Sequence, residues 1–261
     1  MQRLEALVGG ADRVISVEKI AGSGSNRRYY RLHLTDGTTV IGVIGTCVAE
    51  NESFIYLSEY FANRSLPVPR VIAVSTDREA YIQEDLGSTS LYDCLDNTEL
   101  IGAAIDMLPR FQIHGAIGLD FERCYPVPEM DRRSVMWDLN YFKYCFLKPQ
   151  CTEIDEPRLE KEFERMSDAL LSARPLGFMV RDFQSRNVMI RDGQPYLIDF
   201  QGGRRGPVHY DVASFLWQAR ARFSPSLREQ MVERYITASG VDGERFRAEL
   251  PLFVVFRMLQ V

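Results

Sequence analysis

A short β-hairpin pattern in the second half of the chain constrains the fold more than any other feature. The apolar runs at residues 188–190 and 196–198 are joined by the turn residues Asp192 and Gly193. Polar side chains flank this hairpin, because Asp182 and Asn187 precede its first strand and Asp199 follows its second. The surrounding segments have helical periodicity. The candidates for chemistry therefore fall in a β-loop island inside a helical region.

The two halves of the chain differ in their predicted secondary structure. Residues 1–90 predict strands at 14–22, 27–34, 38–45, 66–74 and 80–87, with a helix over 50–65 after the third strand. From about Ser90 the pattern predicts helices near 98–114, 133–147, 156–173, 207–222, 224–239 and 243–260. The sequence thus predicts an α+β protein of two lobes, residues 1–87 and 88–261, divided in the turn-rich stretch from Glu84 to Ser90.

Composition excludes several classes of function. The formal net charge is −5 and both signs are mixed, without the basic stripe that nucleic-acid binding requires. The five cysteines are scattered without a C-x-x-C pair, which favours reduced thiols over a zinc site. No apolar run approaches the ~18 residues of a membrane span, so we expect a cytoplasmic protein with no membrane partner. The apolar, helix-like end of the sequence indicates either a piece of a longer chain or a buried terminal helix.

The order of residues around the hairpin matches the needs of phosphoryl transfer. This reaction requires an oriented acceptor hydroxyl, metal ions that neutralise the phosphates, and a loop over the nucleotide. In the D-x-x-x-x-N spacing, Asp182 can take the proton of the acceptor and Asn187 can bind a metal, while Asp199 can hold Mg²⁺. A solvated loop is the alternative reading of this spacing.

A glycine-rich turn near the N-terminus supplies a candidate loop for the phosphates. Gly22 and Gly24 permit close approach of the backbone, and Ser23 and Ser25 can donate hydrogen bonds to phosphate oxygens. In isolation this segment is better interpreted as a plain hairpin turn. Its position before a strand, a hinge-like segment and the D-x-x-x-x-N motif favours the phosphate-covering role.

Together these motifs resemble the aminoglycoside phosphotransferase and kinase-like superfamily, over nearly the whole length of the chain. The resemblance is closest to a bacterial branch of kinases that phosphorylate the anomeric hydroxyl of N-acetylmuramate and N-acetylglucosamine. It is carried by GSGSNRRYYRL (residues 22–32), ENESF (50–54), LPVPRVIAV (66–74), EDLGSTSL (84–91), MWDLNYF (136–142), LIDFQGG (197–203) and HYDVAS (209–214).

The resemblance implies a two-lobed, protein-kinase-like fold that uses ATP and Mg²⁺. A small antiparallel sheet with one helix would form the first lobe, and a mainly helical second lobe would carry the β-loop island. By the same resemblance Asp182 would be the catalytic base, and Asn187 and Asp199 would be the Mg²⁺ ligands. Residues 84–86, from Glu84 to Leu86, would be the hinge that meets adenine. Asp211, at the start of a helix, would support the catalytic loop.

One expected residue is missing. A kinase-like small lobe normally carries a lysine on its third strand, yet the chain has no lysine between Lys19 and Lys143. Arginines on the second strand are the nearest substitutes, because a guanidinium can donate two hydrogen bonds to phosphate. Alternation along a strand sends Arg27 and Arg31 to one face and Arg28 to the other, and we expect Arg28 to be the substitute.

Residues that would hold the acceptor are proposed on weaker patterns. Arg186 in the catalytic loop, and Arg204 with Arg205 after the second strand, are expected to form a positive rim for an acceptor that carries a carboxylate or phosphate. A flexible solvated loop is the alternative. Asp138 lies on a predicted aromatic-rich helix and is a further candidate for the acceptor pocket, although such an aromatic stripe is usually core.

These observations lead to a functional hypothesis with alternatives. We expect transfer of the γ-phosphate of ATP to a hydroxyl of a small molecule, with a sugar or amino sugar and its anomeric hydroxyl as the best candidate. One alternative is a non-catalytic nucleotide-binding module of a larger protein, since the lysine is absent. Another is a kinase for choline, homoserine or an aminoglycoside.

Overall fold

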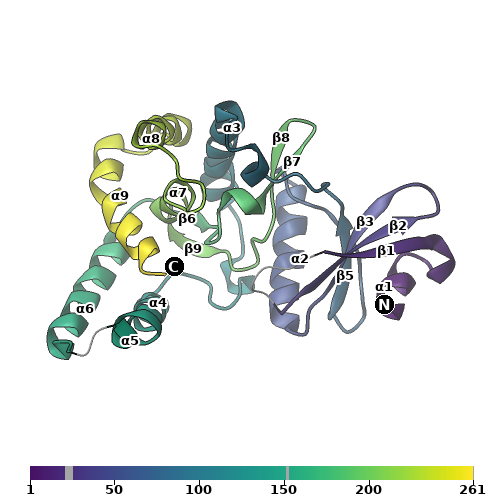
Figure 1. The fold of residues 1–261 in the computed structure, drawn as a ribbon, viewed down its shortest axis with the longest axis horizontal. Helices are drawn as coiled ribbons and strands as arrows, with labels where there is room; N and C mark the ends of the chain where they lie inside the picture. Colours follow the sequence, from purple (N-terminus) through teal and green to yellow (C-terminus); the bar gives the residue numbers. More distant parts are fainter. Residues whose placement is uncertain (21–25, 151–152, 261) are drawn as a thin grey trace.

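The first lobe is built on one antiparallel sheet. In a computed structural model of the chain, residues 1–20, 26–150 and 153–260 are described. Five strands pair in the order β1-β2-β3-β5-β4, as Figure 1 shows. Their bounds are Val14–Ile20 for β1, Arg28–Leu34 for β2, Thr39–Ile44 for β3, Val71–Val74 for β4 and Ala80–Glu84 for β5. The predicted antiparallel arrangement of the N-terminal strands is confirmed.

One helix lies on each face of this sheet. Helix α1 (Gln2–Leu7), which the sequence pattern did not predict, buries Leu4 against a small cluster that includes Leu32 and Ile82. Helix α2 (Val48–Ala62) corresponds to the helix predicted at residues 50–65 and packs against the opposite face. The side chains of β2, β3 and β5 therefore alternate between a closed apolar layer under α1 and the inner face beside α2.

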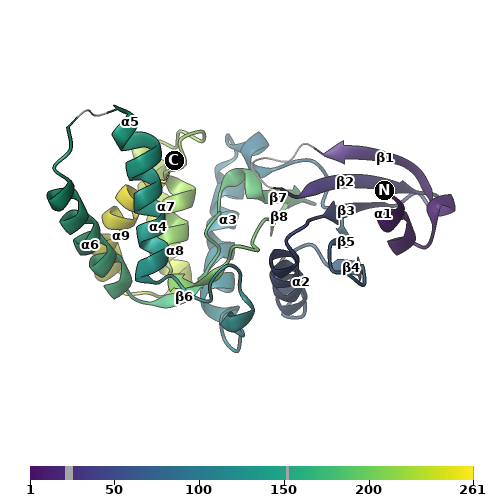
Figure 2. The same ribbon diagram turned by 90° about the horizontal axis from the view of Figure 1, so that it is seen from below.

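The second lobe is mainly helical, and in two perpendicular views its helices α4 to α9 lie away from the sheet (Figures 1 and 2). The α-helices are α3 (Thr98–Pro109), α4 (Arg132–Phe142), α5 (Lys148–Gln150), α6 (Glu156–Ser172), α7 (His209–Leu216), α8 (Pro225–Ser239) and α9 (Gly243–Met258). Short 3₁₀ turns lie at Ala11–Arg13 (η1), Leu91–Cys94 (η2), Phe121–Arg123 (η4) and Ser185–Asn187 (η6). Among the described residues, no helix combines the length and apolar composition needed to cross a bilayer.

Local sequence explains where several of these helices begin. The side chains of Asn97, Asp131, Asp155, Ser224 and Asp242 each accept a hydrogen bond from a backbone N–H in the first turn of α3, α4, α6, α8 and α9. Such N-caps satisfy donors that a helix cannot pair internally. Helix α8 is followed by Gly240, whose left-handed backbone (φ 67°) closes the last turn.

Two helices predicted as continuous change their geometry along their length. The segment predicted at 98–114 is α-helical through Pro109 and then forms a π-helix, η3 (Arg110–His114). The segment predicted at 133–147 likewise ends in a π-helix, η5 (Lys143–Leu147). Helix α7 is shorter than the predicted 207–222 and stops at Leu216. A π-turn inserts an extra residue into a helix, so the side chains that follow rotate relative to a continuous α-helix.

The β-loop island contains two small sheets. Strands β7 (Val188–Arg191) and β8 (Gln194–Leu197) form the predicted hairpin. Strands β6 (Leu176–Met179) and β9 (Arg204–Pro207), which the sequence pattern did not predict, pair antiparallel beside it. Because β6 leads directly to Asp182 and β8 leads to Asp199, the two small sheets fix the backbone at both candidate residues.

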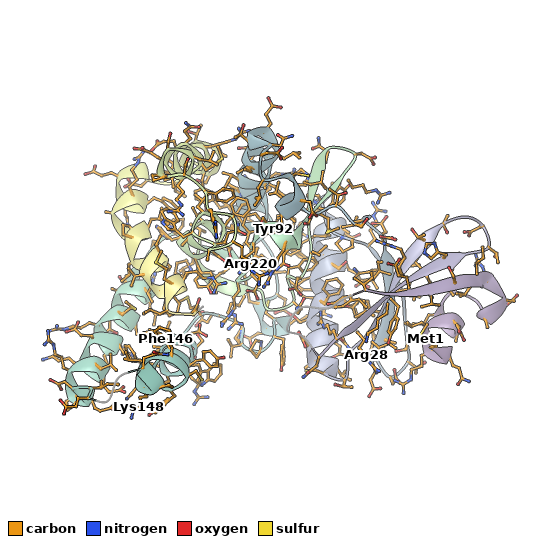
Figure 3. The ribbon with its side chains drawn as sticks, in the orientation of Figure 1. Met1, Arg28, Tyr92, Phe146, Lys148 and Arg220 are labelled. Atoms are coloured by element: carbon orange, nitrogen blue, oxygen red, sulfur yellow. The ribbon has the colours of Figure 1, made fainter. Side chains whose placement is uncertain are left out.

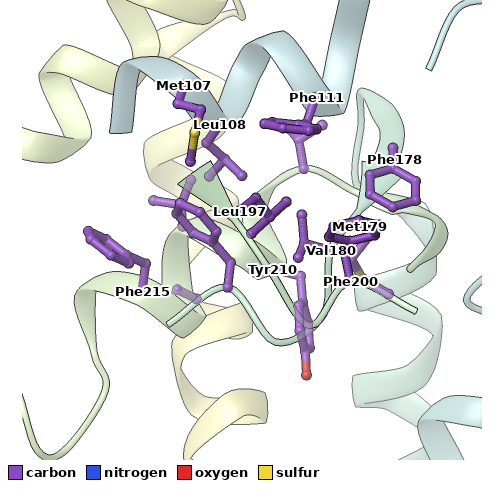
Figure 4. Packing of buried hydrophobic residues seen from close by; sticks show 14 of the residues in the cluster. Met107, Leu108, Phe111, Phe178, Met179, Val180, Leu197, Phe200, Tyr210 and Phe215 are labelled. Carbon is purple, nitrogen blue, oxygen red and sulfur yellow. The ribbon is translucent and has the colours of Figure 1, made fainter. Parts of the chain in front are cut away.

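A chain of phenylalanines joins the two lobes. Phe54 of α2 stacks on Phe200 at a centroid distance of 4.9 Å, and Phe61 meets Phe111 and Phe178 edge-on at 5.1 and 4.9 Å. Figure 4 shows Phe111, Phe178 and Phe200 packed around Val180, just before the catalytic loop. All of these rings belong to one buried cluster that runs from β3 to α9. Helix α2 is therefore anchored in the second lobe as well as in the first.

Candidate active site

The larger of two adjoining cavities lies between the sheet and the β-loop island. Its volume is about 630 Å³. Ile20 and Ile41 of the sheet form part of one wall, and Met189 and Ile198 of the island form part of the opposite wall. Apolar side chains on two opposed walls suit a flat aromatic ring. The predicted hinge residues Glu84 and Leu86 both line this cavity, as do Asn187 and Asp199.

An ion pair holds the hinge against the sheet. Arg31 of β2 donates to both carboxylate oxygens of Asp85, at 2.6 and 3.1 Å, and to the carbonyl oxygen of Gly87 at 2.9 Å. Burial alone would raise the pKa of Asp85, but hydrogen bonds from Arg31 and from the Gly87 N–H lower it below its usual value. The carboxylate is thus ionised, and this two-point contact fixes the hinge backbone.

A second cavity, of about 490 Å³, adjoins the first. Arg186, Asp199 and Gln201 line both cavities, so these side chains mark the junction. Asp182 lines the second cavity and is not among the residues that line the first. A molecule that extends from the first cavity across the junction therefore reaches the carboxylate of Asp182.

Asp182 stands on a strained and tightly held backbone. The preceding residue, Arg181, has a left-handed φ of 74°, which is costly for a side chain other than glycine. The buried carboxylate of Asp211 accepts hydrogen bonds from the backbone N–H groups of Val180 (2.9 Å) and Arg181 (2.8 Å). Asp211 thus contacts the backbone just before Asp182, and its expected supporting role stays a prediction.

Charges around Asp182 oppose one another. Burial, and then the nearby carboxylate of Asp199, raise the pKa of Asp182, while Arg257, Arg181 and Arg186 lower it to a smaller extent. The net direction is upward from the usual value of an aspartate. A raised pKa is suited to a carboxylate that accepts a proton during a reaction.

The two predicted metal ligands, Asn187 and Asp199, lie close together near the junction of the two cavities. The side-chain nitrogen of Asn187 donates to the carbonyl oxygen of Asp182 (2.9 Å) and lies 3.4 Å from Asp199 Oδ2, which leaves the amide oxygen of Asn187 for a metal. Asp199 has a left-handed φ of 60° and accepts from Gln201 Nε2 at 2.8 Å. The buried Oε1 atom of Gln201 has no hydrogen-bond partner in the described structure.

This donor set consists of hard oxygen donors, which suit Mg²⁺. Mg²⁺ takes one or two carboxylates and completes its shell with water and phosphate oxygens. In the described part of the chain, no group of three His, Cys, Asp or Glu side chains is arranged to hold a metal. A carboxylate, an amide oxygen and the unpartnered Gln201 oxygen are all hard oxygen donors.

The structure places Arg27, and not Arg28, at the cavity wall. Arg28 is exposed and lines neither cavity (Figure 3). Arg27 is 4% exposed, lines the second cavity, and lies 3.5 Å from the carboxylate of Glu50 in the first turn of α2. The expectation that favoured Arg28 is therefore not supported. Alternation placed the two arginines on opposite faces, and the face of Arg27 and Arg31 is the one that meets the cavities.

Of the four predicted acceptor residues, which are Asp138, Arg186, Arg204 and Arg205, only Arg186 lines either of the two cavities. Asp138 forms a two-point ion pair with Arg181 (2.9 and 3.1 Å) and also accepts from Gln260 Nε2. Arg204 is 2% exposed, donates to the Gly202 carbonyl at 3.1 Å, and has its pKa lowered to about 10, chiefly by burial. Neither Asp138 nor Arg204 lines the two cavities, because each packs within the second lobe.

The sequence pattern missed several residues of the site. One predicted segment lies outside the described residues. Gly22, Ser23, Gly24 and Ser25 fall in residues 21–25, which lie outside the described residues. The hinge ion pair of Arg31 and the position of Gln201 at the junction were not predicted. Arg31 could have been found from alternation together with Arg27, whereas Gln201 carries no sequence signal beyond its place two residues after Asp199.

The chain matches one family model and several curated proteins. The family model described as "Phosphotransferase enzyme family" matches residues 16–250. The N-acetylmuramate/N-acetylglucosamine kinase of Neisseria meningitidis serogroup B is 26% identical over 229 residues, which cover 82% of this chain and 65% of that protein. The protein of the same name from Pseudomonas putida is 24% identical over 91% of this chain and 70% of its own length. The chain therefore spans about two thirds of the length of these curated relatives.

Solved structures show the fold. A choline kinase from Cryptosporidium parvum Iowa II superposes with a TM-score of 0.70 at 12% identity and covers 97% of this chain and 83% of that one. An amicoumacin kinase gives a TM-score of 0.71 at 12% identity and covers 94% and 78%. The predicted two-lobed, kinase-like architecture of this chain is therefore confirmed. Since the family model spans nearly the whole described chain, this protein belongs to the phosphotransferase enzyme family.

Proposed function

We propose that this chain transfers the γ-phosphate of ATP to a hydroxyl of a small sugar, with the anomeric hydroxyl of an amino sugar as the preferred acceptor. Residues 1–87 would bind the nucleotide, and residues 88–261 would supply the catalytic loop and bind the acceptor. The single observation that carries the proposal is the pair of adjoining cavities, joined at Arg186, Asp199 and Gln201, of which the second contains Asp182. The names of the curated relatives support an amino-sugar acceptor.

The first cavity suits the adenine and ribose of ATP. Its two apolar walls would sandwich the base, and the hinge backbone at Glu84 to Leu86 would meet the edge of the base. The triphosphate would then extend across the junction into the second cavity. There the positive charge of Arg27 would face the phosphates, held in place by Glu50.

The reaction would be a direct displacement at phosphorus. The acceptor hydroxyl oxygen forms a bond to the γ-phosphorus while the bond from that phosphorus to the bridging oxygen breaks, and ADP leaves with the electron pair. The proton of the hydroxyl passes to the carboxylate of Asp182. The pKa of this carboxylate is raised by its burial and by Asp199, which increases its capacity to take the proton.

Asn187, Asp199 and Gln201 are the residues that would hold Mg²⁺. When bound, the metal would neutralise charge on the phosphates. Hydrogen bonds within the chain would keep the metal-binding oxygen atoms of Asn187 and Asp199 in place. The amide of Asn187 does this by donating to the Asp182 carbonyl, and the amide of Gln201 does it by donating to Asp199.

The pairing of Arg27 with Glu50 bears on the alternative of a non-catalytic module. That alternative rested on the absence of a third-strand lysine. Arg27, which precedes β2 and lies beside a carboxylate of α2, would supply this cation from another part of the first lobe. The arginines around Asp182 also favour a neutral or anionic acceptor over a polycationic aminoglycoside.

The test is a phosphorus NMR assay with ATP, Mg²⁺ and a panel of acceptors. The panel contains N-acetylglucosamine, N-acetylmuramate, choline, homoserine and an aminoglycoside. We expect an anomeric sugar phosphate signal, and a loss of ~10²–10⁴-fold in kcat for Asp182→Asn. Asp192→Asn is the matched control, because Asp192 is an exposed acid of the β7–β8 turn. ATP binding without turnover on any acceptor would instead support the non-catalytic module.

A further inference from the structure

A fully buried glutamine connects the catalytic loop to two distant helices. Gln112 lies in the π-helix η3 and has no exposed surface. Its side-chain nitrogen donates to Asp211 Oδ2 at 2.8 Å and to the Val208 carbonyl at 3.0 Å. Its side-chain oxygen accepts from the hydroxyl of Tyr235 in α8 at 2.5 Å. Every hydrogen-bonding atom of this amide is therefore occupied.

These partners fix which way the amide faces. Two of them, Asp211 and the Val208 carbonyl, are acceptors, and the third, Tyr235, is a donor. If the amide were reversed, its oxygen would face two acceptors, and the buried groups would lose their hydrogen bonds. The two acceptors, Asp211 and the Val208 carbonyl, thus determine that the nitrogen of Gln112 points at Asp211, and the hydroxyl of Tyr235 holds the amide from its oxygen side.

The backbone of the π-helix is also in direct contact with the strand that leads to the catalytic loop. A Cβ atom placed on Gly177 of β6 would lie 2.2 Å from the carbonyl oxygen of Gln112, so no larger residue fits there. Strand β6 runs from this contact to Met179, and the next residues are those that Asp211 holds. Two independent contacts therefore tie η3 to the segment before Asp182.

We propose that Gln112 and Tyr235 are positioning residues for phosphoryl transfer. They hold the carboxylate of Asp211, which in turn holds the backbone of Val180 and the strained Arg181. The strain at Arg181 would relax if its N–H lost this partner, and Asp182 would move with it. This inference rests on the proposed function, since it assigns the role of the held segment to catalysis.

The charge state of Asp211 provides a readout of this arrangement. Burial raises its pKa to about 7, Asp182 adds to this effect, and the hydrogen bonds from Val180, Gln112 and Arg181 oppose it. Tyr235, from α8, is the other titratable group that interacts with this carboxylate. Loss of the Gln112 donor would raise the pKa further, so Asp211 would be protonated at a higher pH.

The test compares Tyr235→Phe with Tyr60→Phe in the phosphorus NMR or coupled ADP assay, using the best acceptor of the panel. Both changes remove one tyrosine hydroxyl; that of Tyr60 donates to the Ile117 carbonyl, away from both cavities. We expect Tyr235→Phe to lower kcat about tenfold with KM for ATP within twofold, and to move the acid limb of kcat to higher pH. Tyr60→Phe should change neither.

A second variant separates positioning from folding. Gln112→Leu should lower kcat about a hundredfold, and Gln112→Glu should place a carboxylate against Asp211 and move the acid limb further than Tyr235→Phe does. If Gln112→Leu fails to fold, Tyr235→Phe decides the question. Equal kcat and an unmoved acid limb in Tyr235→Phe would overturn the inference while Asp182→Asn still abolishes turnover. Full activity in Asp182→Asn would overturn the proposed function itself.

Discussion

The guanidinium of Arg27 lies 3.5 Å from the carboxylate of Glu50 and donates to the Glu50 carbonyl at 3.0 Å. The residue immediately before β2 is thereby joined to the first turn of α2. Because Arg27 also lines the cavity that contains Asp182, this pair has the place and the charge that a nucleotide phosphate requires.

Replacement of Arg27 should therefore weaken ATP binding, and replacement of its neighbour should not. We expect Arg27→Met to raise KM for ATP at least tenfold, because a charged contact to phosphate is lost and Glu50 faces the cavity unpaired. Arg28→Met, a change of the same size one residue away on the exposed face, is the control. Steady-state kinetics and calorimetric ATP titration measure both. Equal KM values for the two variants would contradict the assignment.

The hinge ion pair predicts coupling between Arg31 and Asp85. The side chain of Asp85 is 5% exposed, so removal of Arg31 leaves a buried carboxylate without its main partner. We expect Arg31→Met to destabilise the protein by ~2–4 kcal/mol and to raise KM for ATP. The paired change to Arg31→Met with Asp85→Leu should recover part of that loss. Urea unfolding of both single variants and the double variant gives the coupling, and strictly additive effects would exclude it.

Metal removal should act on ATP binding as well as on turnover. Asp199 offers a carboxylate at the junction of the two cavities, so we expect wild-type protein to bind ATP more tightly with Mg²⁺ than with EDTA. In Asp199→Asn this difference should shrink at least tenfold. Titration calorimetry with Mg²⁺ and with EDTA measures it directly. An undiminished Mg²⁺ effect in Asp199→Asn would place the metal elsewhere.

The stabilising contribution of His209 should be lost on acidification. Its ring is fully buried and stacks between Phe246 and Phe253 at 4.4 and 5.0 Å, and burial lowers its pKa to about 4. The unfolded chain therefore binds the proton first, so the contribution of His209 to stability is fully present above about pH 6.5 and falls by roughly 3 kcal/mol as pH approaches 4.

The matched variant isolates this effect. In His209→Gln the side chain is neutral at every pH, so Tm at pH 5 relative to Tm at pH 7 should be higher than in the wild type. The raised pKa of Asp211 acts in the opposite direction over the same range and is common to both proteins. The difference between the two pH profiles therefore reports on His209, and parallel profiles would contradict the prediction.

Sequence patterns predicted what depends on local periodicity. Alternation along β2 correctly separated Arg27 from Arg28, but the face that meets the cavities depends on how the sheet packs against the island. Likewise Asp138 was recognisable as a carboxylate on a helix, while its pairing with Arg181 arises from the approach of α4 to the catalytic loop. The roles of the base and the metal ligands stay predictions, but the closeness of Asp182, Asn187 and Asp199 could be predicted because they flank one short hairpin.

Gln112 shows the limit of such patterns most clearly. In the sequence Gln112 is one polar residue within a predicted helix. In the structure the π-turn after Pro109 and the close approach of Gly177 bring its amide to Asp211. Gly177 and Asp211 lie 65 and 99 residues after Gln112 in the sequence. Local periodicity cannot predict contacts between segments so far apart.

The phenylalanine contacts between α2 and the second lobe have a consequence for cooperativity. Since Phe54 and Phe61 are buried against rings from both halves of the sequence, neither lobe possesses a complete core of its own. The chain should then melt in a single calorimetric transition, with equal van't Hoff and calorimetric enthalpies. Slow-exchanging amides should extend without a break from the sheet into the helical bundle.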